Sequence, residues 1–308
     1  MRRCLGRRAL LCGTLLLGAV TPACSLSPDE QRVPGLDRVR RASIFYSAIA
    51  ARDEPDIVRR FYAPRDYVRS DALPKGLDVA RRRRYALPTS LRVRWEGFYG
   101  VRHWVRLGCG PSTPGTILYD PEERSLTPRP EQRDFPGSVR RAARLVNDTG
   151  CHDFGIAPGA TLLFGFDPDA CSHDLEQAPL GRLPWRQIDI LDIQSQRLLS
   201  DHCWRHGGLE TYRAVVDAIA RFVRARNPSI SVLAQVSFRY SPPQRMHTAL
   251  AGVADEIDGF YFSYPTTSPT PCRYCSVSNL TAFLEPLRGN DVGRGPGRRK
   301  PSRAGMAQ

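Results

Sequence analysis

The 308-residue sequence contains almost no lysine: Lys75 and Lys300 are the only two, so arginine carries nearly all of the positive charge. Much of the net charge of +14 lies near the two ends of the chain, and the segment between them is only weakly basic. Arg81–Arg84 is the one dense basic run in that segment, and no pattern of aromatic residues is interleaved with it. Nucleic-acid binding is therefore not favoured, because a nucleic-acid site needs clustered basic charge together with aromatic side chains on which bases stack.

Several signatures of other protein classes are also absent. No Gly-x-Ser-x-Gly sequence is present, which argues against a serine hydrolase. No glycine-rich loop opens a helix to hold a phosphate, and no internal repeat is visible. The longest apolar run, Ala9–Val20, is too short to span a bilayer permanently.

The first residues have the pattern of an export signal. Four arginines among the first eight residues precede Ala9–Val20, and small residues lead to Cys24. Residues 21–24 resemble a lipobox in which Thr21 replaces the usual leucine, so a plain cut after Ala23 remains an alternative. Arg7-Arg8 resembles a twin-arginine signal without its flanking residues, which favours general secretion. We expect a signal peptide over residues 1–23 and lipidation at Cys24, which places the protein outside the cytoplasm, anchored to the cell membrane or freely secreted.

The number of cysteines supports export independently. Cys4 and Cys12 leave with the signal, and lipidation of Cys24 would leave six cysteines able to pair, as proteins in oxidising compartments require. Many pairings are possible, and we prefer those that join neighbours along the chain. These are Cys109 with Cys151, Cys171 with Cys203, and Cys272 with Cys275.

The remaining chain suggests one folded domain with two extensions. Residues 24–40 are polar and contain prolines, which predicts a lipid anchor followed by a linker. Residues 41–287 have the length and apolar content for a single large core. Residues 288–308 are basic and rich in glycine and proline, and we expect a disordered tail.

Short β-rich runs alternate with amphipathic helices through this domain, as in a parallel sheet. The pattern predicts a (β/α)₈ TIM-like barrel or a close variant. A doubly wound open sheet is the alternative, because strand signals are weak over the first hundred residues. The predicted strands are 44–49, 91–99, 116–119, 154–157, 188–193, 231–238 and 259–263, and the predicted helices are 135–149, 209–226, 243–254 and 278–287.

Five motifs together resemble a group of secreted actinobacterial proteins over roughly residues 42–287. The motifs are Tyr119-Asp120-Pro121-Glu122 with Thr127-Pro128 and Glu131-Gln132, Asp192-Ile193-Gln194-Ser195-Gln196, Gln235-Val236-Ser237-Phe238-Arg239, Asp258 through Pro265, and Cys272-Arg273-Tyr274-Cys275. The resemblance implies an exported barrel and does not specify a reaction.

Two carboxylates follow the predicted strand 116–119. Working groups of such barrels lie at the carboxyl ends of strands, and alternation directs Asp120 and Glu122 to the same side. Two neighbouring carboxyl groups can push each other's pKa values apart, which leaves one protonated as an acid and the other charged. The Asp-x-Glu ending is also similar to that of chitinase-type glycosidases, although Gly115–Tyr119 lacks their additional aspartates. Alternatively, Glu122 caps the following loop and Asp120 holds a backbone amide.

Amides and aromatic residues occur at other strand ends. Glutamine both donates and accepts hydrogen bonds, which suits hydroxyl-rich ligands, and tyrosine offers a face on which sugars stack. Such residues can instead satisfy the polar layer inside a barrel. The candidate binding residues are Asp192, Gln194, Gln196, Gln235, Arg239, Tyr261 and Tyr264.

Two further patterns have competing interpretations. Zinc-capable residues cluster at Cys171, His173, His202, Cys203 and His206. A disulfide between the two cysteines is the preferred interpretation, so we expect no metal and no cofactor. Cys272 and Cys275 have redox spacing but follow a proline-rich loop, which favours a structural disulfide.

These features support two functional hypotheses. The first is an exported, lipid-anchored, glycosidase-like barrel that acts on an extracellular or cell-wall polysaccharide through Asp120 and Glu122. The alternative is a non-catalytic surface protein that binds glycans. Both hypotheses predict a carbohydrate ligand and attachment to a membrane through the N-terminal lipid, and neither predicts a nucleic-acid partner or an oligomeric state.

Changing Cys24 to Ser tests the predicted anchor. We expect Cys24→Ser to move the protein from the membrane fraction to the soluble fraction, because the lipid would supply its membrane affinity. Fractionation followed by immunoblotting measures the distribution. Full membrane retention of the variant would contradict lipidation at this cysteine.

Overall fold

The computed structural model describes residues 35–63, 65–69, 85–89, 100–106, 108–110, 115–122, 127–266 and 271–288. The predicted signal peptide with Cys24, the predicted strand 91–99, the Arg81–Arg84 run and residues 289–308 of the predicted tail lie outside these residues. The predicted tail begins one residue too early, because Arg288 is the buried last residue of a helix. Within them, no helix is both long enough and apolar enough to cross a membrane.

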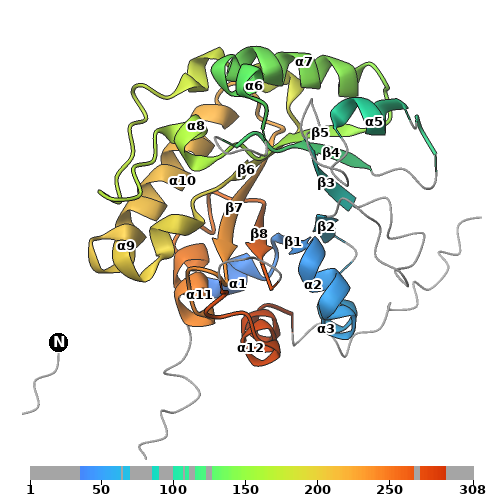
Figure 1. The fold of residues 1–308 in the computed structure, drawn as a ribbon. Helices are drawn as coiled ribbons and strands as arrows, with labels where there is room; N and C mark the ends of the chain where they lie inside the picture. Colours follow the sequence, from blue (N-terminus) through green and yellow to red (C-terminus); the bar gives the residue numbers. More distant parts are fainter. Residues whose placement is uncertain are drawn as a thin grey trace, which may run out of the picture. The chain divides into compact units, whose positions relative to one another are not determined.

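The described strands form a closed barrel of eight parallel strands in sequence order (Figure 1). Closure comes from β1 pairing with β8, where Phe45 lies opposite Tyr261 and Tyr46 opposite Phe262. This confirms the predicted (β/α)₈ barrel, since a doubly wound sheet would leave two open edges. The strands are β1 Ser43–Ser47, β2 Tyr67–Arg69, β3 Tyr85–Thr89, β4 Thr116–Tyr119, β5 Asp153–Ile156, β6 Ile190–Ile193, β7 Ser231–Ser237 and β8 Gly259–Ser263.

Helices occupy most of the described connections between these strands and lie around the barrel (Figure 1). The α-helices are α1 Leu36–Val39, α2 Ala48–Asp53, α3 Pro55–Phe61, α5 Val101–Arg106, α6 Arg129–Arg133, α7 Phe135–Asn147, α8 Ala160–Phe164, α9 Asp201–Arg205, α10 Gly208–Arg224, α11 Pro243–Ala251 and α12 Val277–Arg288. The 3₁₀ helices are η2 Pro179–Arg182, η3 Trp185–Gln187 and η4 Gln196–Leu199.

The later elements lie close to their predicted positions. Strand β8 has the predicted bounds, and α10 begins one residue earlier and ends two residues earlier than expected. Its predicted apolar stripe, including Tyr212, Val215, Val216 and Ile219, is buried. Helix α11 ends at Ala251 instead of Ala254, because the chain turns from Gly252 onward.

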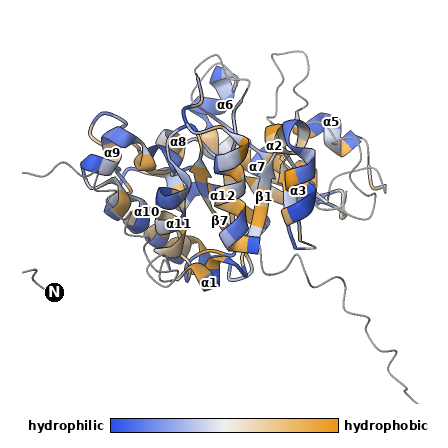
Figure 2. Cartoon of the chain, turned by 90° about the horizontal axis from the view of Figure 1, so that it is seen from below, coloured by the Kyte–Doolittle hydropathy of each residue, from blue (hydrophilic) through white to orange (hydrophobic). Residues whose placement is uncertain are grey.

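Side chains alternate between the outer and inner faces of the strands. Outward residues such as Ile44, Ile117 and Phe260 belong to the main core between strands and helices. Strands β1 and β7 carry the apolar colour in Figure 2, whereas the surrounding helices also present polar residues. A second, smaller cluster fills the inside of the barrel and is called here the apolar floor; it comprises Phe45, Ile190 and Leu233, with Tyr67 and Tyr261 packed against them.

Gly155 on β5 makes room for the barrel interior. A Cβ atom at this position would stand 2.7 Å from Leu118 Cδ1 and 3.3 Å from Ile190 Cβ. Contacts of 2.7 Å would force Leu118 or the strand to move. Glycine at 155 therefore allows the inward side chains of β4 and β6 to approach each other.

Three disulfide bonds join the six described cysteines. They connect Cys109 with Cys151, Cys171 with Cys203, and Cys272 with Cys275, as the sequence predicted. Bonds of this kind are typical of proteins that fold in an oxidising compartment.

A buried ion pair connects the end of the barrel to its beginning. Arg288 Nη2 lies 3.0 Å from Asp66 Oδ1, and the two side chains are 1% and 0% exposed. Arg288 is the last residue of α12, and Asp66 stands directly before β2. The pair therefore joins the end of the last helix to the starts of β1 and β2.

Both members of this pair have additional hydrogen bonds. Asp66 accepts from the backbone N–H of Ile44 at 2.9 Å and of Ala63 at 2.7 Å. Arg288 donates to the carbonyl oxygens of Ala42, at 2.7 Å, and Arg40. Burial raises the pKa of Asp66, while Arg288 and the backbone donors lower it. The guanidinium stays protonated when buried, so it stabilises the charged carboxylate.

Replacement of Arg288 by methionine tests the importance of this pair. We expect Arg288→Met to lower the free energy of unfolding by about 3–5 kcal/mol near neutral pH, because it leaves a buried carboxylate without its counter-ion. The variant's Asp66 pKa should rise further above its unfolded value. The loss of unfolding free energy caused by the substitution should therefore grow as the pH increases from acid to neutral. In that range the unfolded chain releases the Asp66 proton more readily than the folded variant does. Urea denaturation at several pH values measures both effects.

Arg141→Met is the matched control. Arg141 pairs with Asp134 at 3.0 Å, but both side chains are about half exposed. Its loss should cost about 1 kcal/mol or less. Equal effects of the two substitutions would show that burial at Arg288 does not matter.

Candidate functional site

Inward side chains change from apolar to polar toward the carboxyl ends of several strands. On β4 and its continuation Leu118 is followed by Asp120, and on β7 Leu233 is followed by Gln235. On β6 the inward series is Ile190, Asp192 and, just after the strand, Gln194. We call the polar set Asp120, Asp192, Gln194 and Gln235 the mouth. It lies above the apolar floor, at the end of the barrel where such folds hold their active sites.

A hydrogen-bonded amide connects two of these residues across the barrel. Gln194 Nε2 donates to Asp120 Oδ1 at 2.8 Å and to the carbonyl oxygen of Ala157 at 2.7 Å. Both hydrogens of the amide are therefore used, and its orientation is fixed. The donated hydrogen bond holds the Asp120 carboxyl group in one direction.

Gln235 presents a buried acceptor to the same region. The residue is 4% exposed, and its Oε1 has no hydrogen-bond partner among the residues that the structure describes. A buried acceptor left unsatisfied costs about 1–3 kcal/mol. A ligand hydroxyl that donates to Oε1 would recover that free energy, so Gln235 is suited to binding.

Asp192 of the mouth and Tyr212 are both deeply buried. Asp192 is 1% exposed on β6, and Tyr212 is fully buried on α10. Burial and the nearby Asp192 charge raise the pKa of the Tyr212 phenol, whereas a hydrogen bond with Ser195 lowers it. Tyr212 therefore stays neutral and donates to the backbone carbonyl of Gln235 at 3.4 Å. Tyr212 therefore helps to hold the backbone of β7 at Gln235, a role that the sequence did not indicate.

The backbone of Glu122 is fixed beside the ends of β4 and β5. Its N–H donates to Thr127 Oγ1 at 2.7 Å. The adjacent Pro121 carbonyl accepts a 2.8 Å hydrogen bond from the N–H of Gly159. Glu122 is half-buried, two residues beyond Asp120 on the continuation of the same strand.

The remaining candidate residues occupy different places. Tyr264 is 2% exposed and packs edge-on against Phe238, with ring centroids 5.4 Å apart. The proposed stacking role of Tyr264 is therefore wrong. Tyr264 directly follows β8 and, like Phe260 and Phe262, lies an even number of positions along the strand on its outward face. Tyr261 has the inward parity and lies half-buried on the floor.

Gln196 and Arg239 lie beyond their strands. Gln196 begins η4 and is half-buried. Arg239 is half-buried two residues after β7, and its backbone N–H donates to Ser237 Oγ at 3.2 Å. Because both have left the regular strand, period-two alternation does not fix their direction.

Two aromatic residues of the interior were not anticipated. Phe45 and Tyr67 stack with their ring centroids 4.2 Å apart and their planes 9° apart. Phe45 is in register with Tyr261 on the neighbouring β8. Alternation within residues 43–47 could have placed Phe45 inside, but β2 was too short to be recognised from its sequence.

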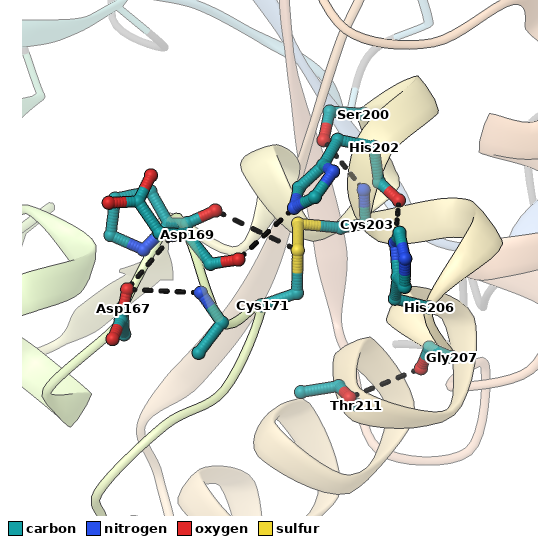
Figure 3. The surroundings of a disulfide bond; sticks show 11 residues. Asp167, Asp169, Cys171, Ser200, His202, Cys203, His206, Gly207 and Thr211 are labelled. Carbon is teal, nitrogen blue, oxygen red and sulfur yellow. Dashed lines mark hydrogen bonds between the residues drawn. A yellow bond between two sulfur atoms is a disulfide. The ribbon is translucent and has the colours of Figure 1, made fainter.

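Four of the five zinc-capable residues, Cys171, Cys203, His202 and His206, have other partners. Cys171 and Cys203 form a disulfide, and Figure 3 shows His202 and His206 directed at backbone carbonyl groups. His202 Nε2 lies 3.1 Å from the Asp169 oxygen, and His206 Nδ1 lies 2.8 Å from the His202 oxygen. Among the described residues, no group of three or more histidine, cysteine, aspartate or glutamate side chains could hold a metal ion.

Comparisons with known proteins describe similarity of fold. No protein-family model matches the chain, and no curated protein matches its sequence. A solved structure of active domain 2 of a chitinase from Pyrococcus furiosus is similar with a TM-score of 0.49 and 8% identity, covering 83% of this chain and 97% of that chain. An archaeal fructose-1,6-bisphosphate aldolase has a TM-score of 0.44 and 12% identity, with coverages of 85% and 98%. A glycoside hydrolase family 5 enzyme from Prevotella bryantii has a TM-score of 0.43 and 7% identity, with coverages of 83% and 99%. We draw no functional argument from similarities at these values.

Replacement of Gln194 by methionine tests how the mouth is held together. We expect Gln194→Met to lower the free energy of unfolding by about 1–3 kcal/mol, because Asp120 and the Ala157 carbonyl lose their shared donor. Denaturant unfolding measures the loss. Gln187→Met, at an exposed position in η3, is the control and should change stability by about 0.5 kcal/mol or less. A neutral effect of Gln194→Met would show that the amide does not hold this site.

Proposed function

We propose that the mouth binds carbohydrate and that the protein is an exported, lipid-anchored glycoside hydrolase acting on an extracellular or cell-wall polysaccharide. The observation that carries this proposal is the bond from Gln194 to Asp120, which fixes a carboxylate at the carboxyl end of β4. Export rests on the signal-like residues 1–23, and the three disulfides are compatible with it.

The mouth and the floor together suit a sugar ring. The ring's hydroxyl groups both donate and accept, and they would pair with the Gln235 acceptor and the fixed Asp120 carboxylate. Its C–H face would lie on aromatic surface, for which half-buried Tyr261 is the candidate. This combination of an apolar surface with few fixed polar groups is typical of small-ligand sites.

The proposed reaction assigns different roles to the two carboxyl groups. Glu122 transfers its proton to the glycosidic oxygen as the bond from that oxygen to the anomeric carbon breaks. Asp120, oriented by Gln194, stabilises as a carboxylate the positive charge that develops on the sugar. A water molecule then adds its oxygen to the anomeric carbon, and a proton from that water restores Glu122.

Non-catalytic glycan binding is the second candidate. The observation that favours it is that Asp120 Oδ1 already accepts a hydrogen bond within the protein. Such a carboxylate can act as a fixed acceptor for sugar hydroxyls without taking part in a reaction.

Substitutions at Glu122 and Tyr261 distinguish the two functions. If Glu122 is the general acid, Glu122→Gln should lower turnover by on the order of a hundredfold or more while oligosaccharide binding is retained. Tyr261→Ala should weaken binding under either function, because it removes aromatic surface. Hydrolysis of a polysaccharide panel by the mature protein, followed by calorimetry with the best substrate, measures both.

Glu210→Gln is the matched control, since Glu210 is exposed in the first turn of α10. It should leave turnover and binding unchanged. Binding without hydrolysis by the unmodified protein would favour the glycan-binding function. Hydrolysis that survives Glu122→Gln would remove the acid role from Glu122.

A further inference from the structure

A basic groove of about 280 Å³ lies on the outside of the barrel, between the segment Gln132–Pro136 and residues of α8 and η2. Helices α6 and α8 lie side by side in both Figure 1 and Figure 2. Arg133, Arg140 and Arg182 line the groove, and all three are exposed.

Among the described residues that line the groove, Asp134 is the only carboxylate, and it already has partners. Asp134 accepts a hydrogen bond from Arg141 at 3.0 Å, and another from the N–H of Gly137 at 3.1 Å. The Arg141 hydrogen bond is the main reason that the pKa of Asp134 is lowered. Asp134 therefore stays negative but is neutralised by Arg141, which is not among the residues that line the groove.

The three arginines keep donors available. Arg140 Nη1 donates to the Arg182 carbonyl at 2.9 Å, which holds the two residues together. Within the described part of the chain, neither Arg133 nor Arg182 forms an ion pair with an acidic side chain. A guanidinium group in this condition can bind a carboxylate or sulfate through two parallel hydrogen bonds.

Both sides of the groove are connected to the loop that carries Glu122. On one side, Gln132 Nε2 donates to the Thr127 carbonyl at 2.6 Å, and Thr127 Oγ1 accepts from the N–H of Glu122. On the other side, Gly159 contacts Pro121, and α8 begins at the next residue, Ala160. Residues on both sides of the groove are therefore linked by hydrogen bonds to the segment that follows β4.

We propose that this groove is a subsite for the anionic groups of a polysaccharide whose chain also occupies the mouth. The substrate class is then an acidic glycan, with uronate carboxylates or sulfate esters placed along the chain. This inference rests on the proposed carbohydrate function, because the mouth supplies the position of the neutral part of the chain.

The test compares acidic and neutral oligosaccharides of equal length on the mature protein. The probes are a hexamer of galacturonic acid and its fully methyl-esterified form, with affinity measured by calorimetry at low and high salt. We expect the acidic hexamer to bind about tenfold more tightly at low salt, and this preference to disappear at high salt. The triple variant Arg133→Gln/Arg140→Gln/Arg182→Gln should lose the preference but bind the neutral hexamer within about twofold of the unmodified protein.

The control variant Arg102→Gln/Arg186→Gln/Arg226→Gln removes the same charge at exposed positions outside the groove. It should keep the preference for the acidic hexamer. Equal effects of the two triple variants would overturn the subsite, because total charge would then explain the binding. Absence of binding to the acidic hexamer would overturn it as well.

Two further outcomes separate the possibilities. Neutral binding at the mouth without acidic preference would refute the groove and leave the proposed function intact. Acidic binding that depends on the three arginines but not on Tyr261 would support the groove and refute the mouth as a carbohydrate site. If vesicles of phosphatidylglycerol bind through these arginines and the acidic hexamer does not, the groove faces a membrane and the proposal is wrong.

Discussion

Pairing between the first and last strands is the constraint on which the rest of this structure depends. A parallel barrel holds its interior only if β1 and β8 stay in register, and this pairing joins residues that are more than two hundred positions apart. The buried pair of Arg288 and Asp66 connects the last helix to the start of β1: Asp66 accepts from the N–H of Ile44, and the guanidinium also bonds the backbone of Ala42, which directly precedes β1. A buried charge is costly alone and tolerable when paired, so the chain is held to one closed arrangement.

Closure has a direct consequence for the chemistry of the interior. Inward positions must fill the barrel at its middle and can be polar only near its open end. The change from Leu118 to Asp120, and from Leu233 to Gln235, follows this rule. The same alternation that packs the floor therefore brings Asp120 and Gln194 within hydrogen-bonding distance, although they are 74 residues apart.

Much of the fold could be predicted from the sequence because its signals are local. The amphipathic period of α10, the alternation of β8 and the spacing of the cysteines are each contained in short segments. The early strands were harder, because β2 has only three residues and its stability comes from its neighbours. The alternation of side chains along a strand could also have been applied more strictly. Tyr261 and Tyr264 are three positions apart, so they lie on opposite faces of a strand.

The contacts that define the site could not be predicted in the same way. The partner of Asp66 lies 222 residues away, and the basic groove takes its arginines from α6, α7 and η2. No local pattern relates those positions, since their proximity results from helices packing around a closed barrel. Sequence reasoning identified Asp120 and Gln194 as residues at strand ends, whereas the hydrogen bond between them required the fold.

The most direct measurement of the central claim is a crystal structure of the Glu122→Gln protein with a bound oligosaccharide. The account predicts a sugar ring at the carboxyl end of the barrel, with a hydroxyl group within hydrogen-bonding distance of Gln235 Oε1 and another near Asp120. An oligosaccharide bound only elsewhere, with Gln235 and Asp120 untouched, would contradict it.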